Sequence, residues 1–272
     1  HAASFGLGAY AAAWMTYEHD AAVPVAIAAG MLVSCVVSVV LLPCFRARGA
    51  YFAILTLAFA SIVAQLAREY APNGNSGLIF DSFPVTSRAP LQLLTVGLIG
   101  TLVVVYFLTR SRIGKGLEAV RLDLDAARAV GVDDFRMRSI ALLLASLLNG
   151  WFGAVYGLNL GFVDPETAFN LQWSITPVLA AILGGTATLW GPVAGAAVWI
   201  AISELISVGD LSGGAPLVLQ GAALLIITIL LPRGLAGIAR QVLATLGRRA
   251  GPDRARISDG AAEATDLEEA KS

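Results

Sequence analysis

Hydrophobic positions run through this chain in long blocks that short polar stretches separate. A window of about 20 residues, the length of α-helix that crosses a bilayer, finds eight such blocks. The sixth is too short to span comfortably, and it meets the seventh at residues 184–192, a glycine-rich junction that predicts a tight turn or a broken helix inside the protein. The pattern therefore predicts an all-α, polytopic membrane bundle of about eight spanning segments. These segments cover approximately residues 2–17, 23–43, 50–67, 91–109, 139–160, 173–185, 190–207 and 215–231.

Composition supports the same fold class. Hydrophobic residues make up 57% of the chain and charged residues 14%, and the mean hydropathy is +0.75. A soluble domain carries about 25% charged residues, and a soluble fold of this length would have too little polar surface to cover itself. The chain begins at His1, inside an apparent helix, so we expect that further residues precede it.

The basic residues predict how the chain is oriented in the membrane. Of the 18 Lys and Arg residues, 16 lie in residues 46–48, in residues 110–138 or after residue 231, and alternate crossings place these three regions on one side. The positive-inside rule makes that side the cytoplasm. We therefore expect a membrane domain over residues 1–246 and a disordered cytoplasmic tail over residues 247–272. The loops of the opposite side carry Glu18, Asp20, Asp81, Asp164, Glu166 and Asp210.

Residues with reactive side chains are few, and none has the spacing of a catalytic or metal site. Cys35 and Cys44 have no His or carboxylate at ligand spacing, and neither His1 nor His19 has a triad or zinc-binding partner. Residues 114–116 (GKG) lack the preceding glycine and strand of a phosphate-binding loop. We expect no catalytic residue, metal or cofactor, no nucleic-acid partner and no ATP binding by this chain itself.

The candidates for a translocation path are polar but uncharged. No Asp, Glu, Lys or Arg lies near the middle of a segment, which argues against a proton-driven carrier. A sodium-coupled carrier, which can use backbone carbonyls at broken helices, stays open. Asn149 lies in a stripe of small residues at helical spacing, where it either forms an interhelical hydrogen bond or faces the path. The stripe consists of Ala145, Asn149, Gly153, Gly157 and Gly161, and the path candidates are Thr56, Gln65, Asn149 and Thr176.

The densest charge lies in residues 110–138, which we call the charged loop. Between residues 116 and 130, apolar side chains recur every three or four positions and predict one amphipathic helix, with charged residues on another face at spacings that permit ion pairs. Gly131 is the predicted helix end, in a backbone conformation that glycine adopts at little cost. Such a helix suits a solvated surface or docking into a groove of another protein. The apolar positions are Leu117, Val120, Leu124, Ala127 and Val130, and the charged ones are Glu118, Arg121, Asp125 and Arg128.

Several motifs resemble one family of transporters. Asp125, Ala126 and Ala127, followed by Gly131 and by residues 140–142 (IAL), are similar to the EAA loop of bacterial ABC importer permeases, with Asp125 in place of its Glu. Further stretches, in their order and spacing, resemble the LivM-type permeases of branched-chain amino acid ABC transporters over about residues 1–237. These stretches are residues 48–60 (RGAYFAILTLAFA), 111–115 (SRIGK), 183–192 (LGG and LWGP) and 231–235 (LPRGL).

The resemblance implies a permease subunit of the bacterial inner membrane. Its expected partners are ABC ATPase subunits, a second homologous permease, a periplasmic substrate-binding protein and membrane lipid, and the charged loop would dock on the ATPases. Two alternatives stay open: a urea or short-chain amide ABC permease, whose motifs are similar, and a sodium-coupled secondary carrier. The residues expected to carry ATPase coupling are Glu118, Arg121, Asp125, Ala126, Ala127 and Gly131.

Overall fold

The described chain is almost entirely α-helical, which confirms the predicted all-α fold class. A computed structural model describes residues 1–46, 50–69, 77–80, 83, 88–185, 188–207 and 221. Contacts between residues divide the chain into two compact units, His1–Thr176 and Pro177–Ser272.

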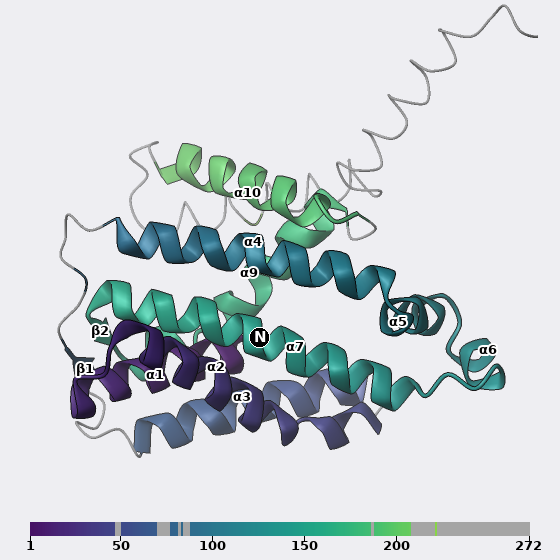
Figure 1. Ribbon diagram of the computed structural model, residues 1–272, viewed down its shortest axis with the longest axis horizontal. Helices are drawn as coiled ribbons and strands as arrows, with labels where there is room; N and C mark the ends of the chain where they lie inside the picture. Colours follow the sequence, from purple (N-terminus) through teal and green to yellow (C-terminus); the bar gives the residue numbers. More distant parts are fainter. Residues whose placement is uncertain are drawn as a thin grey trace, which may run out of the picture. The chain divides into compact units, whose positions relative to one another are not determined.

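Seven of the eight predicted apolar segments coincide with helices (Figure 1). The eighth, residues 215–231, lies outside the described residues, as does the predicted tail, residues 247–272. α9 (Gln172–Gly184) begins in the first unit and ends in the second, which also contains α10 (Gly191–Ser207). The other elements are α1 (Ala2–His19), α2 (Val23–Val39), η1 (Leu42–Arg46), α3 (Ala50–Glu69), β1 (Leu78–Ile79), α4 (Ala89–Arg110), α5 (Arg112–Leu122), α6 (Leu124–Ala129), α7 (Asp134–Leu160), β2 (Phe162–Val163) and α8 (Pro165–Ala168).

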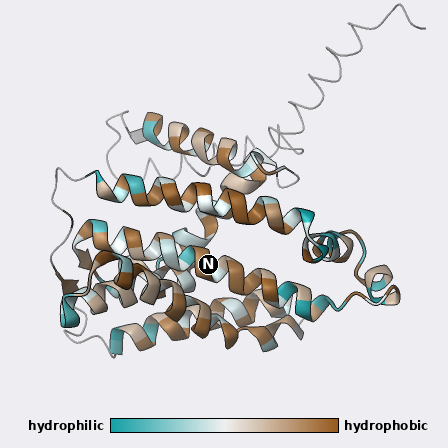
Figure 2. Ribbon diagram, viewed as in Figure 1, coloured by the Kyte–Doolittle hydropathy of each residue, from teal (hydrophilic) through white to brown (hydrophobic). Residues whose placement is uncertain are grey.

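Length and hydropathy identify the helices that suit a membrane. Among the described residues, three helices are long and apolar enough to cross one: Tyr51–Glu69 in α3, Ala89–Arg110 in α4 and Asp134–Leu160 in α7. α2 and α10 are apolar but shorter. Figure 2 shows apolar residues along α4 and α7 and hydrophilic residues where these helices meet the charged loop.

The core of the first unit is the contact among α1, α2 and α7, and it depends on glycine. A Cβ atom on Gly8 would lie 2.7 Å from the Gly150 Cα atom, and one on Gly30 would lie 3.3 Å from the Gly8 Cα atom. A Cβ atom on Gly153 would overlap the Phe5 carbonyl oxygen. Between membrane helices, such close backbone approach supplies the van der Waals packing that replaces the hydrophobic effect. The small-residue stripe predicted in α7 is therefore a packing surface.

Four buried serines lie in the same three-helix core, and the sequence pattern did not single them out. The Ser34 hydroxyl donates to the Ser4 carbonyl oxygen (2.6 Å), and the Ser38 hydroxyl donates to the Ser34 carbonyl oxygen (2.7 Å). The Ser4 hydroxyl donates to the Ser146 Oγ atom (3.3 Å). Because every one of these hydroxyls has a partner inside the core, we interpret the serines as residues that pair the helices.

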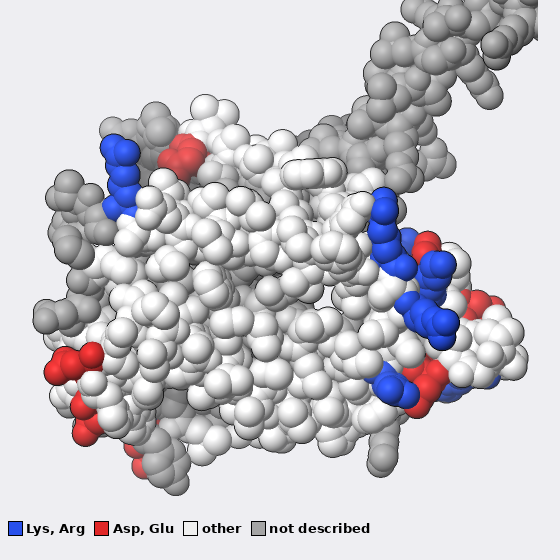
Figure 3. Space-filling model, in the orientation of Figure 1, with Lys and Arg blue, Asp and Glu red and all other residues white. Residues whose placement is uncertain are grey.

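A two-stranded antiparallel sheet lies at the end of the first unit opposite the charged loop (Figure 1). Leu78 pairs with Val163, and Ile79 pairs with Phe162, so the segment after α3 is joined to the segment after α7. Asp164, an acidic residue of the predicted outer side, follows directly and caps α8. Figure 3 shows most of the visible basic side chains gathered at the charged loop, with acidic ones among them, and acidic side chains at the opposite end. This concentration of basic residues accords with the positive-inside rule.

The second predicted segment, residues 23–43, is longer than the helix that forms there. α2 ends at Val39, and the 3₁₀ helix η1 follows. Pro43 explains the shortening, because proline lacks an N–H group and disfavours α-helical backbone at the preceding residue. Cys35 in α2 and Cys44 in η1 are free thiols.

In the second unit, α9 and α10 cross very closely after a glycine-rich turn. A Cβ atom on Gly184 would overlap the Gly191 carbonyl oxygen, and one on Gly195 would overlap the Ala180 carbonyl oxygen. Gly185, with φ +96°, occupies the left-handed region at the end of α9. At the junction predicted as a tight turn or a broken helix, α9 ends at Gly184 and α10 begins at Gly191, while residues 186–187 lie outside the described residues.

Candidate functional site

The charged loop begins at a serine that ends one helix and starts the next. Ser111 has an extended backbone (φ −75°, ψ 169°) between α4 and α5. Its hydroxyl donates to the Leu108 carbonyl oxygen (2.7 Å) and accepts from the Gly114 N–H group (3.2 Å), so it satisfies a free group at each helix end. A Cβ atom on Gly114 would overlap the same Leu108 carbonyl oxygen. The turn from α4 into α5 therefore requires glycine there.

α5 packs on the chain that leads into α7. A Cβ atom on Gly116 would lie 3.2 Å from the Met137 Sδ atom and 3.7 Å from the Val132 Cγ1 atom, so these two side chains pack on α5 at this point. At the other end of the loop, the Asp133 carboxylate accepts a hydrogen bond from the Arg136 N–H group (3.1 Å) and caps α7. Both ends of the charged loop are thus defined by capping side chains.

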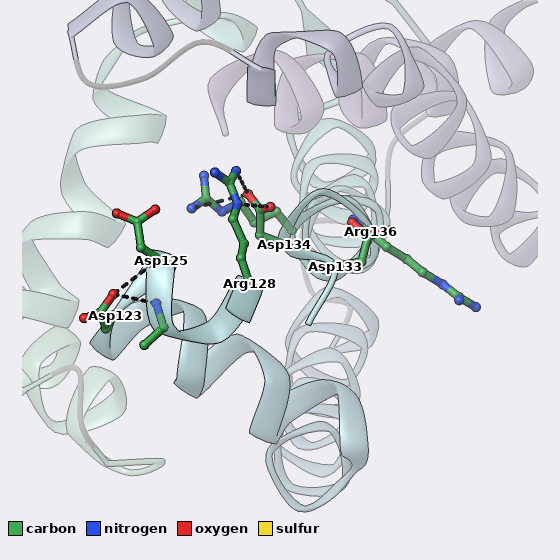
Figure 4. Close-up of polar contacts among 8 residues, drawn as sticks. Asp123, Asp125, Arg128, Asp133, Asp134 and Arg136 are labelled. Carbon is green, nitrogen blue, oxygen red and sulfur yellow. Dashed lines mark hydrogen bonds and ion pairs between the residues drawn. The ribbon is translucent and has the colours of Figure 1, made fainter. Parts of the chain in front are cut away.

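The single helix predicted over residues 116–130 is wrong, because two helices form there. Asp123 has an extended backbone (φ −152°, ψ 115°) and separates α5 from α6. Its Oδ1 atom accepts hydrogen bonds from the N–H groups of Asp125 (2.9 Å) and Ala126 (3.0 Å), as Figure 4 shows. An aspartate is more stable at a helix N-cap than in a helix interior, since its carboxylate binds free N–H groups. The apolar periodicity continues across the break, so the period alone did not locate it.

Replacing Asp123 with alanine should loosen the start of α6. Loss of an N-cap carboxylate costs about 1 kcal/mol. The locally opened state of α6 then becomes roughly fivefold more populated, and its amide hydrogens exchange faster by the same factor. Hydrogen-exchange mass spectrometry of a peptide containing Asp125 and Ala126 measures this effect. Asp123→Asn, which keeps a side-chain oxygen acceptor, is the matched control and should exchange like the wild type. Equal exchange in wild type and Asp123→Ala would contradict the capping role.

The end of α6 is a glycine cap of the kind that the sequence predicted. Gly131 has φ +85°, in the left-handed region. Its N–H group donates to the Arg128 carbonyl oxygen (3.0 Å), and the Val132 N–H group donates to the Ala127 carbonyl oxygen (3.0 Å). This pair of bonds is the Schellman motif. The predicted conformation of Gly131 is therefore confirmed, and the motif ends α6 and reverses the helical backbone before α7 begins.

The ion pair formed in the charged loop differs from those that helical spacing permitted. Arg128 donates from Nε to Asp134 Oδ1 (2.9 Å) and from Nη2 to Asp134 Oδ2 (3.0 Å), a bidentate pair between α6 and α7 (Figure 4). This hydrogen bonding raises the pKa of the Arg128 guanidinium above its ordinary value. Asp125 acts on Arg128 only through space, and among the described residues neither Glu118 nor Arg121 has an ion pair.

The expected coupling residues form an accessible surface with one buried member. Ala127 is buried, with 3% of its surface exposed. Large apolar side chains are exposed beside the charges: Leu122 is 77% exposed and Val130 is 78% exposed. Leu122 is the last residue of α5 and Val130 directly follows α6, and both give the charged surface an apolar component. The exposed coupling candidates are Glu118, Arg121, Asp125, Ala126 and Gly131.

Residues 1–230 match the sequence profile of the family described as branched-chain amino acid transport system / permease component. The chain belongs to this family. It is therefore a permease component of the branched-chain amino acid type of ABC transporter, and a multi-pass membrane protein. No solved structure matches the permease.

Individual relatives place the permease within the family. It is 26% identical to the high-affinity branched-chain amino acid transport system permease protein LivM of Salmonella typhimurium, over 88% of this chain and 63% of the relative. It is 24% identical to the corresponding LivH protein of Escherichia coli, over 58% of this chain and 50% of the relative. The autoinducer 2 import system permease protein LsrC of Klebsiella pneumoniae is 34% identical over 34% of this chain and 28% of the relative. The permease thus spans less than two thirds of the length of each of these relatives.

The four path candidates lie on three helices of the permease, and no hydrogen bond among the described residues joins any two of them. Thr56 donates to the Ala53 carbonyl oxygen of its own helix (3.0 Å) rather than to a neighbouring helix. Gln65 is exposed on α3, and Thr176 is half-buried on α9. The Asn149 amide nitrogen lies 2.9 Å from the His1 Nδ1 atom, an interhelical contact between α7 and the start of α1. The geometry therefore favours packing for Asn149 and a local role for Thr56.

Sequence reasoning missed the residues that give the charged loop of the permease its shape. Asp123 directly precedes α6 and Asp133 directly precedes α7. Aspartate directly before helix-forming residues is an N-cap signal that could have located both helix starts. The partnership of Arg128 with Asp134 had no such signal. The two residues are six positions apart, on different helices, and only the turn at Gly131 brings them together.

Proposed function

We propose that this chain is the membrane-spanning subunit of an ATP-driven importer of branched-chain amino acids in the bacterial inner membrane, and that its charged loop docks on ATPase subunits. One observation carries the proposal. The short helix α6 is capped at both ends, by Asp123 and by the Gly131 turn, its Asp125 is exposed, and the exposed side chains of Leu122 and Val130 flank it in the chain. A preformed helix with apolar anchors and polar surroundings suits a groove in another protein.

The proposed assembly contains a second permease, two ATPase subunits and a periplasmic substrate-binding protein. Support for a permease pair comes from the relatives, because the names of LivM and LivH both specify permease proteins of a high-affinity branched-chain amino acid transport system. Support for the orientation comes from the concentration of basic side chains at the charged loop. With the charged loop on the cytoplasmic side, the sheet and α8 face the periplasm, from which the substrate arrives.

In this proposal the chain converts movement of its partners into movement of its helices. ATP binding draws the ATPase subunits together, and α6 follows the subunit on which it is docked. α7 then tilts as a rigid body, and the path opens alternately to the two sides. The binding protein supplies most of the selectivity, while uncharged polar groups and backbone carbonyls of the permease shield the zwitterion during passage.

Capture of the intact assembly tests the proposal. The chain, carrying an affinity tag and expressed in its native bacterial host, should co-purify with ATPase and permease subunits in mild detergent. After reconstitution, leucine, isoleucine or valine together with the binding protein should stimulate ATP hydrolysis, and urea and acetamide should not. Stimulation by urea or acetamide instead would identify an amide permease. Sodium-driven uptake by the chain alone, without ATP, would establish a secondary carrier and refute the importer.

A further inference from the structure

The orientation of α6 relative to α7 is set by few contacts. A helix of six residues is too short to be stable by itself, so its position depends on what it touches. Asp123, with its extended backbone, separates α6 from α5, and the Gly131 turn separates it from α7. Within the described residues, the side-chain hydrogen bonds that join α6 to α7 are those between Arg128 and Asp134. This pair is therefore in a position to decide how movement of α6 reaches α7.

The geometry of the pair suits transmission of movement. Two parallel N–H···O bonds, 2.9 and 3.0 Å long, fix both the separation and the relative orientation of the guanidinium and the carboxylate. Asp134 belongs to the first turn of α7, and Arg138, one turn later, approaches the same carboxylate at 4.0 Å. Figure 4 shows Arg128 reaching from α6 to Asp134 while Arg136 extends away from the pair.

The far part of α7 is packed so tightly that the helix must move as one body with its neighbours. Gly150 contacts the backbones of Gly8 and Gly30, and Gly153 contacts the backbone of Phe5. Glycine contacts between main chains leave no side chain that can yield. A displacement applied at Asp134 therefore continues into α1 and α2 instead of being absorbed within α7.

We propose that the Arg128–Asp134 ion pair is the positioning link that transmits movement of the docked helix α6 to α7 and thus to the core of α1, α2 and α7. This inference rests on the proposed function and assigns a role within it. Neither residue contacts substrate or reacting atoms. Their contribution to stability is small, since exposed ion pairs contribute little to folding. Their contribution to coupling comes from geometry, because the two parallel hydrogen bonds fix the orientation of α6 on α7.

A double-mutant cycle on the reconstituted importer tests this link. Arg128→Ala and Asp134→Ala should each lower the ratio of stimulated to basal ATP hydrolysis by about fivefold, the lower range of measured coupling between sites. The stimulant is the binding protein loaded with the branched-chain amino acid to which the wild type responds most strongly. The double variant should lose no more than either single one, because both remove the same link. Arg128→Lys, which keeps the charge but not the fork, should give an intermediate ratio.

The readouts separate this link from docking and from folding. Arg136→Ala, two residues from Asp134 on α7, is the matched control and should keep the wild-type ratio. All variants should co-purify with as much ATPase subunit as the wild type. Unchanged ratios in the single variants, losses that multiply in the double variant, or loss of the captured ATPase would each overturn the proposal. Failure of the proposed function would look different, because the wild-type chain itself would then capture no ATPase.

Discussion

Gly131→Val is expected to uncouple the proposed importer while the chain remains in the membrane. At φ +85° a β-branched residue is strained, by about 1–3 kcal/mol, and 1.4 kcal/mol corresponds to about a tenfold change in an equilibrium. The variant relieves the strain by leaving the left-handed region, which breaks the two hydrogen bonds at the end of α6. Substrate-stimulated ATP hydrolysis should then fall about tenfold, measured at equal amounts of reconstituted complex.

Gly131→Asn is the control that isolates the backbone effect. A Cβ atom at position 131 would meet no atom within 4 Å, so neither substituted side chain is excluded by its neighbours. Asparagine tolerates the left-handed region far better than valine does. The asparagine variant should therefore keep most of the stimulation. Full stimulation in Gly131→Val would remove the main support for a docking role of this turn, and equal losses in both variants would show that backbone conformation is not the cause.

Gly153→Ala is expected to destabilise the helix bundle itself. The added methyl group would overlap the Phe5 carbonyl oxygen at the crossing of α1 and α7, where main chain meets main chain. Overpacking of a tight core costs about 1–3 kcal/mol, and here the helices can relieve it only by moving apart. The variant should unfold at a clearly lower temperature in detergent, and the folded fraction recovered from membranes should fall.

Gly100→Ala is the matched control for this packing argument. Gly100 also lies inside a membrane helix, α4, but a Cβ atom there would meet nothing within 4 Å. Alanine in an open helical position stabilises by about 0.5–1 kcal/mol relative to glycine. The two substitutions are chemically identical and should shift the midpoint of thermal unfolding in opposite directions. A rise of similar size in both would show that helix propensity, and not the contact with Phe5, controls the outcome.

The apolar segments were predicted well because the hydrocarbon core of a bilayer restricts a spanning segment to apolar residues. A spanning helix must be apolar over about 20 residues, so α3, α4 and α7 could be located to within a few residues of their ends. The predicted segment at residues 139–160 ends where α7 ends, since Gly161 (φ +66°) closes the helix in the left-handed region. The helix end that was missed in the second segment is Val39, because the apolar run continues to Pro43 and hides the effect of this proline on the residues before it.

The charged loop was predicted less completely, for a different reason. Periodicity reports only which positions share a helical face, and it continues through Asp123 although the backbone does not. The Gly131 cap could be predicted, because it depends on one residue and its nearest neighbours. The partner of Arg128 could not, because helical spacing offered Asp125 and a turn between two helices supplied Asp134.

The sequence by itself determined the all-α membrane class, the placement of charge at one end and the glycine that ends α6. Each of these follows from local composition, from the solvent around a segment or from the preferred backbone of one residue type. Only the tertiary structure decided which glycines meet across α1, α2 and α7, how the buried serines pair and which carboxylate receives Arg128. Those contacts join residues that are distant in the chain or separated by a turn. The pattern of residue types along the sequence does not specify the angle at which two helices cross.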